Sequence, residues 1–135
     1  MSLINDVCWI SIPSNKDNRG VLTSIEGGID IPFCIKRIFY MHHITLDRGG
    51  HAHRDTDQVI IAISGAFIFH ISDSTSTKTF QLNDATCGLY VPRMLFIEIV
   101  QESPNSVCLV LANTHYDKTQ SVRTYQQFLE ETNSR

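Results

Sequence analysis

The chain has 135 residues, 42% of them hydrophobic, which suffices for one domain with a core over residues 1–135 and is short for two. Its formal net charge is -3 and its Lys and Arg residues are scattered, which argues against a surface for nucleic acid or membrane and favours a small-molecule ligand. The N-terminus has no basic start of a signal peptide, and the longest apolar run is too short to cross a bilayer, so we expect a cytoplasmic protein.

Most of the chain is predicted to form short strands. The candidates are rich in β-branched and aromatic residues, and turn-forming sequences such as DRGG, DSTST and ESPNS separate them. In chain order they are VLTSIE (21–26), CIKRIFYMHHIT (34–45), QVIIAI (58–63), AFIFHIS (66–72), KTFQL (78–82), GLYV (88–91), MLFIEIV (94–100) and SVCLVLAN (106–113). Such short connections favour an antiparallel sandwich or barrel of the jelly-roll kind.

The C-terminal tail has a different pattern. In VRTYQQFLEE (122–131), Val122, Tyr125, Phe128 and Leu129 recur at helical spacing, which predicts one amphipathic helix across the barrel end. The predicted fold class is therefore all-β, a jelly-roll antiparallel β-barrel with one C-terminal helix.

The stretch RGGHAH (48–53) places two imidazoles one residue apart. In an extended chain, residues i and i+2 point to the same face, so His51 and His53 would project together into the interior that the strand lines. Three interpretations are open: metal ligands, hydrogen-bonded polar residues without chemistry, or proton-transfer groups. The other histidines have no comparable spacing and are expected to be ordinary polar groups.

The surrounding spacing resembles the cupin motifs, in which HxH is followed by a glutamate and, on a later strand, by a fourth ligand. Here Gln58 stands at the glutamate position, and an amide is a poorer ligand for divalent cations. Ile97 stands where the last histidine is expected. The four cysteines have no CxxC spacing, which disfavours structural zinc and a disulfide scaffold. The pattern therefore favours a cupin barrel with no metal and no other cofactor.

Proton transfer is the interpretation that fits the pair best. Two purely structural histidines would be unusual on a face that points into a barrel filled by Val, Ile and Phe. Imidazole has an ordinary pKa near 6.5, so it exchanges a proton at cytoplasmic pH, as enolisation at a ketone requires. Two imidazoles can divide the tasks of acid and base.

These residues are part of a longer pattern that resembles the dTDP-sugar 3,4-ketoisomerases. Those cupin-type enzymes act on dTDP-4-keto-6-deoxyglucose on the way to 3-amino-3,6-dideoxyhexoses. The resemblance covers nearly the whole chain, and its most specific parts are IPFCIKRIFY (31–40) and RGGHAH (48–53). The other matching residues and stretches are NRGVLTSIE (18–26), Gln58, Gly65, GLYV (88–91), VLAN (110–113) and YDKTQSVRTYQQF (116–128).

The resemblance implies an isomerisation without a metal. A base removes the proton at C3 of the sugar, next to the C4 ketone, and the resulting enediol-type intermediate is reprotonated at C4. The resemblance implies His53 as the base and His51 as its acid partner or second proton carrier. Tyr40 is a candidate donor to the enediolate oxygen, with an ordinary strand aromatic as an equal alternative.

Cationic residues in the matching motifs suit a nucleotide diphosphate. Arg19, Arg37 and Arg48 are candidates for substrate binding, because the planar guanidinium fits phosphate oxygens, and Gln58 is a further candidate. Lys36 alternates in direction with Arg37, so we expect Lys36 to point into solvent.

The resemblance also has departures. Phe96 and Ile97 stand where the family usually has tryptophan followed by a polar or basic residue, on a segment that shapes the sugar side of the pocket. At position 19, arginine resembles the pattern of the family members that form 3-keto-6-deoxygalactose. We therefore expect that product and not 3-keto-6-deoxyglucose.

The resemblance, together with apolar strand faces in excess of what a small barrel buries, leads us to expect a homodimer. The rival interpretations are a metal-dependent cupin enzyme, a non-catalytic sugar-nucleotide-binding cupin, and a related 3,5-epimerase. Gln58 and Ile97 argue against the first, the intact HAH sequence argues against the second, and the third lacks such a close histidine pair.

Overall fold

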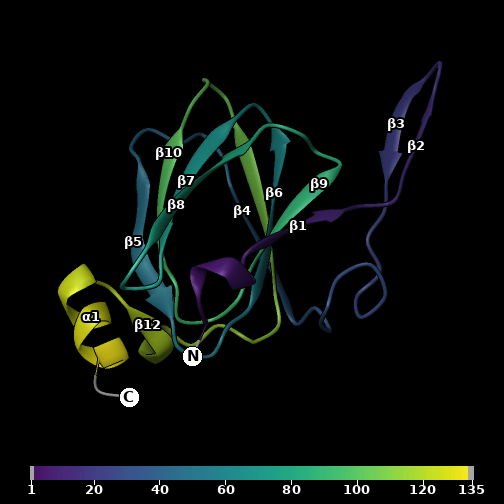
Figure 1. Cartoon of the computed structure of the whole chain (residues 1–135). Coiled ribbons are helices and arrows are strands. Elements are labelled where there is room, and N and C mark those ends of the chain that lie inside the picture. Colours follow the sequence, from purple (N-terminus) through teal and green to yellow (C-terminus); the bar gives the residue numbers. More distant parts are fainter. Residues whose placement is uncertain (1, 134–135) are drawn as a thin grey trace.

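The computed structural model describes residues 2–133 and consists mainly of two five-stranded sheets (Figure 1). The first sheet has the strand order β1, β9, β6, β11, β4, and the second has the order β12, β5, β10, β7, β8. The first contains β1 (Cys8–Ser11), β9 (Cys87–Val91), β6 (Gln58–Ser64), β11 (Val107–Ala112) and β4 (Arg37–Met41). The second contains β12 (Ser121–Val122), β5 (Arg48–His53), β10 (Phe96–Gln101), β7 (Phe67–Ser72) and β8 (Thr77–Leu82).

A separate hairpin and three helical segments complete the fold. The hairpin is β2 (Ser14–Asp17) and β3 (Gly20–Thr23), and the helical segments are η1 (Ile4–Asp6), η2 (Lys118–Gln120) and α1 (Tyr125–Asn133). All pairings between these strands are antiparallel. The predicted class, all-β with antiparallel strands and one C-terminal helix, is confirmed. Within residues 2–133, no helix is both long and apolar enough to span a membrane.

Three apolar layers hold the fold together. The main core lies between the sheets and takes alternate residues of β7, namely Phe67, Phe69 and Ile71. A second layer lies on the outer face of the first sheet, where the segment 24–36 packs over β6, so β6 is buried on both faces and reads as an unbroken apolar run. The third layer lies under α1 and contains Ala52, Met94, Phe96, Val122 and Phe128.

The strands expected at 21–26 and 34–45 are shorter than predicted. β3 ends at Thr23 and β4 begins at Arg37, because the chain between them packs Ile25, Phe33 and Ile35 on the outer face of the first sheet. The apolar character of this segment therefore reflects packing and not strand pairing.

Helix α1 begins later than the predicted start at Val122. Val122 instead pairs with Ala52 in the ladder between β12 and β5. The hydroxyl of Thr124 accepts a hydrogen bond from the backbone N–H of Gln127 at 3.1 Å and caps the helix that begins at Tyr125. The residues before Tyr125 are thus part of the barrel wall.

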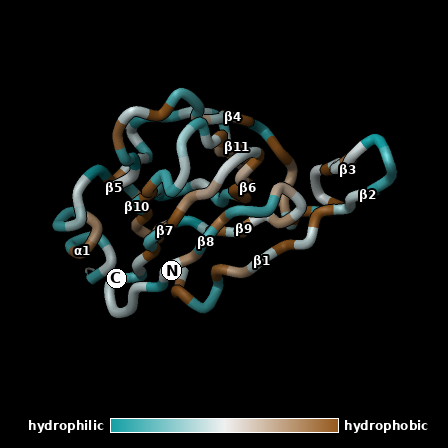
Figure 2. Tube along the Cα trace, turned by 90° about the horizontal axis from the view of Figure 1, so that it is seen from above, coloured by the Kyte–Doolittle hydropathy of each residue, from teal (hydrophilic) through white to brown (hydrophobic). Residues whose placement is uncertain are grey.

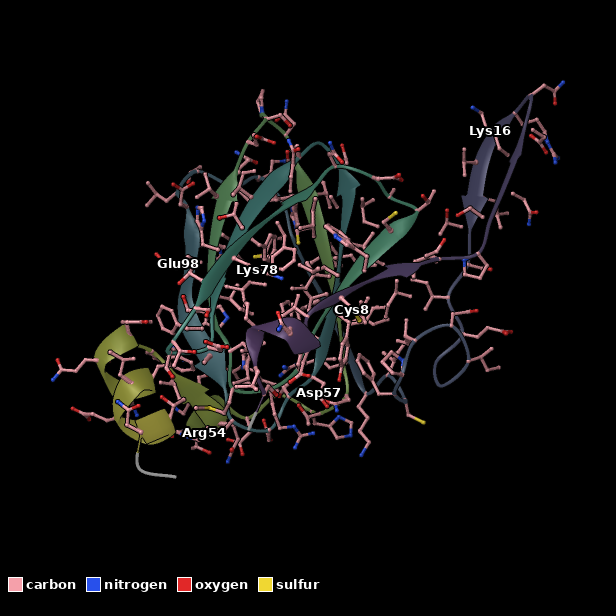
Figure 3. The ribbon with its side chains drawn as sticks, in the orientation of Figure 1. Cys8, Lys16, Arg54, Asp57, Lys78 and Glu98 are labelled. Carbon is pink, nitrogen blue, oxygen red and sulfur yellow. The ribbon has the colours of Figure 1, made fainter. Side chains whose placement is uncertain are left out.

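Arg54 fastens the helix to the end of the barrel (Figure 3). Its guanidinium donates to both carboxylate oxygens of Glu131, at 2.7 and 2.8 Å, and to the carbonyl oxygen of Thr119 at 2.6 Å. Because Arg54 directly follows His53, these bonds hold the segment 119–131 against the end of the histidine strand.

The hairpin of β2 and β3 projects away from the two sheets (Figures 1 and 2). All four residues of β2 are exposed, and Lys16 marks the position of this strand in Figure 3. Val21 and Leu22 on β3 are 54% and 65% exposed. An isolated chain therefore leaves the apolar side chains of the hairpin uncovered.

Candidate active site

A cavity of about 690 Å³ lies between the two sheets. Its volume is in the range of small-molecule binding sites. Strands β4, β6 and β11 of the first sheet and β5, β7 and β10 of the second contribute lining residues, and Thr56 and the segment 116–123 contribute the rest.

β5 carries both predicted histidines into this cavity. The rings of His51 and His53 lie 4.9 Å apart between centroids, at an interplanar angle of 79°. Ala52 between them points the other way and is wholly buried under α1. The prediction that RGGHAH presents two imidazoles to one interior surface is confirmed.

Gly49 lets β5 approach β10 closely just before the histidines. Its φ is 110°, in the region that favours glycine, and a Cβ at this position would lie 2.6 Å from the Cα of Glu98. The register shifts at this point: Ile97 pairs with His51 and Glu98 pairs with Gly49. The irregularity sets the direction in which the histidine strand enters the cavity.

The ring of His53 is neutral at pH 7. Burial, then the repulsion from His51 when that ring is also protonated, and then the positive charge of Arg37 lower the pKa of His53 from 6.5 to about 4. Its Nε2 atom is buried and has no hydrogen-bond partner within residues 2–133. A neutral, unpartnered ring nitrogen at a cavity is free to accept a proton from a bound molecule.

His51 is shifted in the same direction. Burial is the largest cause of its lowered pKa, and the charges of Arg123 and Arg48 act in the same sense. A hydrogen bond with the backbone of Gly49 partly opposes them. Both imidazoles are therefore held in the uncharged form at neutral pH.

Apolar side chains form much of the wall around the histidines. Ile97, placed at the last cupin ligand position by the sequence, lines the cavity beside His51 and is 3% exposed. The other apolar lining residues include Phe39, Ile60, Phe69, Ile99 and Val110.

Arg37 and Arg48 line the same cavity, as expected if they bind substrate. The Arg37 guanidinium lies 5.3 Å from the ring centroid of Phe39 and 5.4 Å from that of Tyr116. Its Nε atom is buried without a hydrogen-bond partner within residues 2–133. The rings of Phe39 and Tyr116 thus orient the Arg37 guanidinium, which keeps one N–H donor unused. Lys36, the residue before it, is exposed, as predicted.

Gln58 is the fifth predicted residue that the structure brings to the cavity. It lies on β6 and is 4% exposed. Thr56, also buried, lines the cavity nearby and shares a hydrogen bond of 2.6 Å with the hydroxyl of Thr114. Gln58 and Thr56 thus add uncharged polar groups to the largely apolar lining.

Two predicted site residues lie outside the cavity. Tyr40 is 62% exposed and points to the opposite side of β4 from Arg37 and Phe39, because strand side chains alternate. Arg19 lies at the turn of the projecting hairpin, where its side chain is 86% exposed and its Nη2 lies 2.6 Å from the Asp17 carboxylate. Within one chain, the structure does not support the predicted contacts of Tyr40 and Arg19 with a substrate.

The segment 116–123 contributes cavity residues that were not expected. Ser121 and Val122 pair with His53 and Ala52, which places this segment beside the histidine strand. The helical spacing of residues 122–131 predicted a helix at the end of this segment. The signal for a role at the site was that the segment lies in the stretch 116–128, which resembles the ketoisomerases. The residues concerned are Tyr116, Asp117, Ser121 and Arg123.

Metal-binding geometry is absent from the described chain. Within residues 2–133, no three His, Cys, Asp or Glu side chains are placed to hold one ion. At the cavity, His51 and His53 are accompanied by Gln58 and Ile97 at the other positions of the cupin pattern.

The fold and the cavity together define a cupin-like barrel with a polar and cationic interior site. The cavity combines two neutral imidazoles, groups that can exchange protons, with arginines that place positive charge next to them.

Comparison with known proteins identifies the family to which this cupin-like barrel belongs. The family model described as FdtA, WxcM-like, C-terminal, matches residues 5–133. TDP-4-oxo-6-deoxy-alpha-D-glucose-3,4-oxoisomerase from Aneurinibacillus thermoaerophilus is 34% identical over 114 residues, which are 83% of this chain and 82% of that protein. The chain belongs to the FdtA, WxcM-like family.

Solved structures agree with this assignment. The sugar 3,4-ketoisomerase QdtA from Thermoanaerobacterium thermosaccharolyticum, in complex with TDP, is 34% identical with a TM-score of 0.93, over 98% of both chains. A histidine-to-asparagine mutant of QdtA, in complex with TDP-4-keto-6-deoxyglucose, has the same identity and TM-score over 99% of this chain and 98% of that one. The cupin-type barrel suggested by the histidine spacing is thus confirmed.

Proposed function

We propose that the protein is a 3,4-ketoisomerase that converts dTDP-4-keto-6-deoxyglucose to a dTDP-3-keto-6-deoxyhexose without a metal, and that residues 1–135 form one such domain. The observation that carries the proposal is the convergence of two neutral imidazoles, His51 and His53, with Arg37 and Arg48 at one cavity. The relatives named above act on, or were solved with, TDP-linked compounds of this class, TDP being the same nucleotide as dTDP.

The proposed reaction is an internal redox change that needs no outside electron acceptor. His53 Nε2 takes the proton from C3, the C3–H electrons form the C3–C4 double bond, and the C4 carbonyl electrons move onto oxygen. A proton then adds to C4, and the proton of the C3 hydroxyl passes to the C4 oxygen, which leaves a ketone at C3 and a hydroxyl at C4. His51 is the proposed partner that supplies or carries the second proton.

Two kinds of contact are proposed to place the substrate. Arg37 and Arg48 bind diphosphate oxygens, for which the guanidinium plane is well suited. The buried amide of Gln58 binds an oxygen of the sugar. Ile97 packs against the sugar ring, and its lack of a polar group keeps water from the reacting carbons.

We further propose that the protein works as a homodimer. Val21, Leu22, Ile38 and Tyr40 are 54%, 65%, 56% and 62% exposed, and all lie on the hairpin or on the outer face of β4. A second copy that covers these side chains would also give the Arg19 hairpin a cavity to reach, that of its partner. Sedimentation should give about twice the chain mass of 15.3 kDa at micromolar concentration, and a monomer would contradict the pairing.

The activity is tested by incubation with dTDP-4-keto-6-deoxyglucose in deuterated water, followed by NMR of the sugar ring. We expect the ketone to move to C3, deuterium to enter at C4, and galacto stereochemistry at C4 of the product. The reaction should persist in the presence of a chelator. No change in the ring signals, or activity that a chelator abolishes and a metal restores, would refute the proposal.

A further inference from the structure

The arginines of this chain fall into two groups. Residues 2–133 contain six of them, and three form ion pairs: Arg19 with Asp17, Arg54 with Glu131, and Arg93 with Asp57. The other three form no ion pair within residues 2–133, and all three line the cavity: Arg37, Arg48 and Arg123. Unpaired guanidinium groups that converge on one cavity indicate an anionic ligand with several oxygens.

The backbone just before Arg123 is fixed by packing and strand pairing. Val122, the residue before it, is wholly buried with Phe128 in the layer under α1, and pairs with Ala52 of β5. Because side chains alternate along an extended segment, a buried Val122 sends Arg123 to the other side, where it lines the cavity.

Arg123 also acts on both members of the histidine pair. Burial is the main cause of the lowered pKa of His51 and of His53, and the positive charge of Arg123 adds to it at both rings. At His53 the charge of Arg123 contributes less than those of His51 and Arg37, and at His51 Arg48 contributes as well. Beside His53, β4, β5, the segment after β5 and the segments before and after β12 supply charged or titratable groups, while β10 faces it with Ile97 and Ile99. Those groups are Arg37, Arg48, His51, Asp55, Tyr116, Asp117 and Arg123.

We propose that Arg123 is a third arginine of the diphosphate site and that it couples occupancy of this site to proton transfer at the histidine pair. This inference rests on the proposed function. In the empty cavity, unpaired positive charges disfavour a proton on His53. A bound diphosphate neutralises them, and the penalty on the charged ring decreases when the substrate is present to be deprotonated.

The coupling predicts that the histidines titrate differently in the empty and the occupied enzyme. Addition of dTDP to the wild type should raise the protonation midpoint of His53, measured by NMR with the signal assigned from His53→Asn. In Arg123→Gln the midpoint without dTDP should already be higher than in the wild type, and dTDP should raise it less.

Affinity provides the second measurement. By calorimetry at fixed ionic strength, Arg123→Gln should bind dTDP about tenfold or more weakly than the wild type, since charge-assisted hydrogen bonds to phosphate are lost. Arg123→Lys keeps the charge but not the planar fork, so it should retain the wild-type midpoint of His53 and still bind dTDP more weakly.

Lys78→Gln is the matched control. Lys78 is an exposed cation on β8, outside the cavity, so its loss removes one positive charge and should change neither the affinity nor the midpoint. Thermal unfolding establishes that each variant is folded. If Arg123→Gln does not fold, the affinity is tested with Arg123→Lys alone.

The outcomes separate this inference from the proposed function. A wild type that neither binds dTDP nor isomerises the substrate refutes the proposed function. A wild type that does both, with dTDP affinity within about twofold in Arg123→Gln and Arg123→Lys, refutes the third arginine alone. Weaker binding with an unchanged His53 midpoint refutes the coupling.

Discussion

The molecule contains two pairs of neighbouring histidines whose rings are arranged almost identically. His51 and His53 have ring centroids 4.9 Å apart at 79°, and His42 and His43 have centroids 4.9 Å apart at 75°. The first pair is separated by one residue on β5 and lines the cavity, whereas the second follows β4 on an exposed connection. Ring proximity alone therefore does not make an acid/base site, because of these two pairs only His51 and His53 line the cavity.

Local backbone explains why the two pairs differ. Residues i and i+2 of a strand share a face, so both rings of the first pair enter the barrel together. Adjacent residues of a strand would point apart, and His42 and His43 meet because His43 has a φ of 52°. Their Nδ1 atoms lie 2.6 Å apart, and His42 stacks on the exposed Tyr40.

The largest predicted difference between the pairs is in catalysis. His53→Asn keeps a hydrogen-bonding group of similar size but removes the base, so kcat should decrease by about 10²–10⁴-fold. His51→Asn should also be impaired, with a combined loss in the double variant that is less than multiplicative.

His42→Asn is the control for these variants. The same substitution on the exposed connection should leave kcat within about twofold of the wild type. Equal losses in His42→Asn and His53→Asn, or a near-normal kcat in His53→Asn, would contradict the division of roles between the pairs.

The pairs should also differ in how they make stability depend on pH. The pKa of His53 is about 4 in the folded protein and 6.5 when exposed, so the unfolded chain binds more protons between these values. The free energy of unfolding should therefore decrease as pH falls from 6.5 toward 4, by up to about 3 kcal/mol from this residue. Urea unfolding between pH 4 and 8 measures the effect.

Substitution isolates the contribution of the cavity pair. His53→Asn should flatten this part of the stability profile, while His42→Asn should leave it as in the wild type. A profile with the same slope in His53→Asn would assign the pH dependence to other groups, such as the carboxylates.

The positive charge beside the first pair gives the next prediction. Arg37→Ala and Arg48→Ala should each weaken dTDP binding by about tenfold or more, because each removes charge-assisted contacts of ~1.5–3 kcal/mol. Arg93→Ala, which removes a cation paired with Asp57 outside the cavity, serves as the comparison. Unchanged affinity in both cavity variants would place the phosphates elsewhere.

A polar group beside His51 should undo part of the effect of burial on the cavity pair. Ile97→Asn admits water to the wall that pairs with His51, so the protonation midpoint of His53 should rise from about 4 toward 6.5 and that of His51 should rise as well. NMR titration of the histidine signals distinguishes this from a general change, and unaltered midpoints of the cavity pair would rule out burial as the cause.

Periodicity predicted those parts of the site that depend on strand alternation. His51 with His53, and Arg37 against Lys36, follow from a period of two, and the same rule places Tyr40 on the face opposite Arg37. The cavity position of Arg123 depends instead on pairing between residues far apart in sequence, β12 with β5, which no local pattern reports.

The fold was predictable to the same extent. Long apolar runs such as β6 and β7 were identified because their burial is continuous or strictly alternating. β2 is fully exposed and β12 is a two-residue strand, so neither has a burial pattern to detect. The segment 24–36 has the apolar composition of a strand but packs on a sheet face.

Gly49 limits the sequences that can encode this site. A Cβ at this position would lie 2.6 Å from the Cα of Glu98, 2.7 Å from the carbonyl oxygen of Ile97 and 2.8 Å from the backbone nitrogen of Ile99. All three atoms are backbone, so no change of side-chain rotamer relieves the clash, and a replacement displaces β5 from β10 together with both imidazoles. In a library of all single substitutions selected for isomerase activity, variants substituted at position 49 would be depleted as strongly as variants substituted at position 53. The heritable information for proton transfer thus includes a residue that has no side chain.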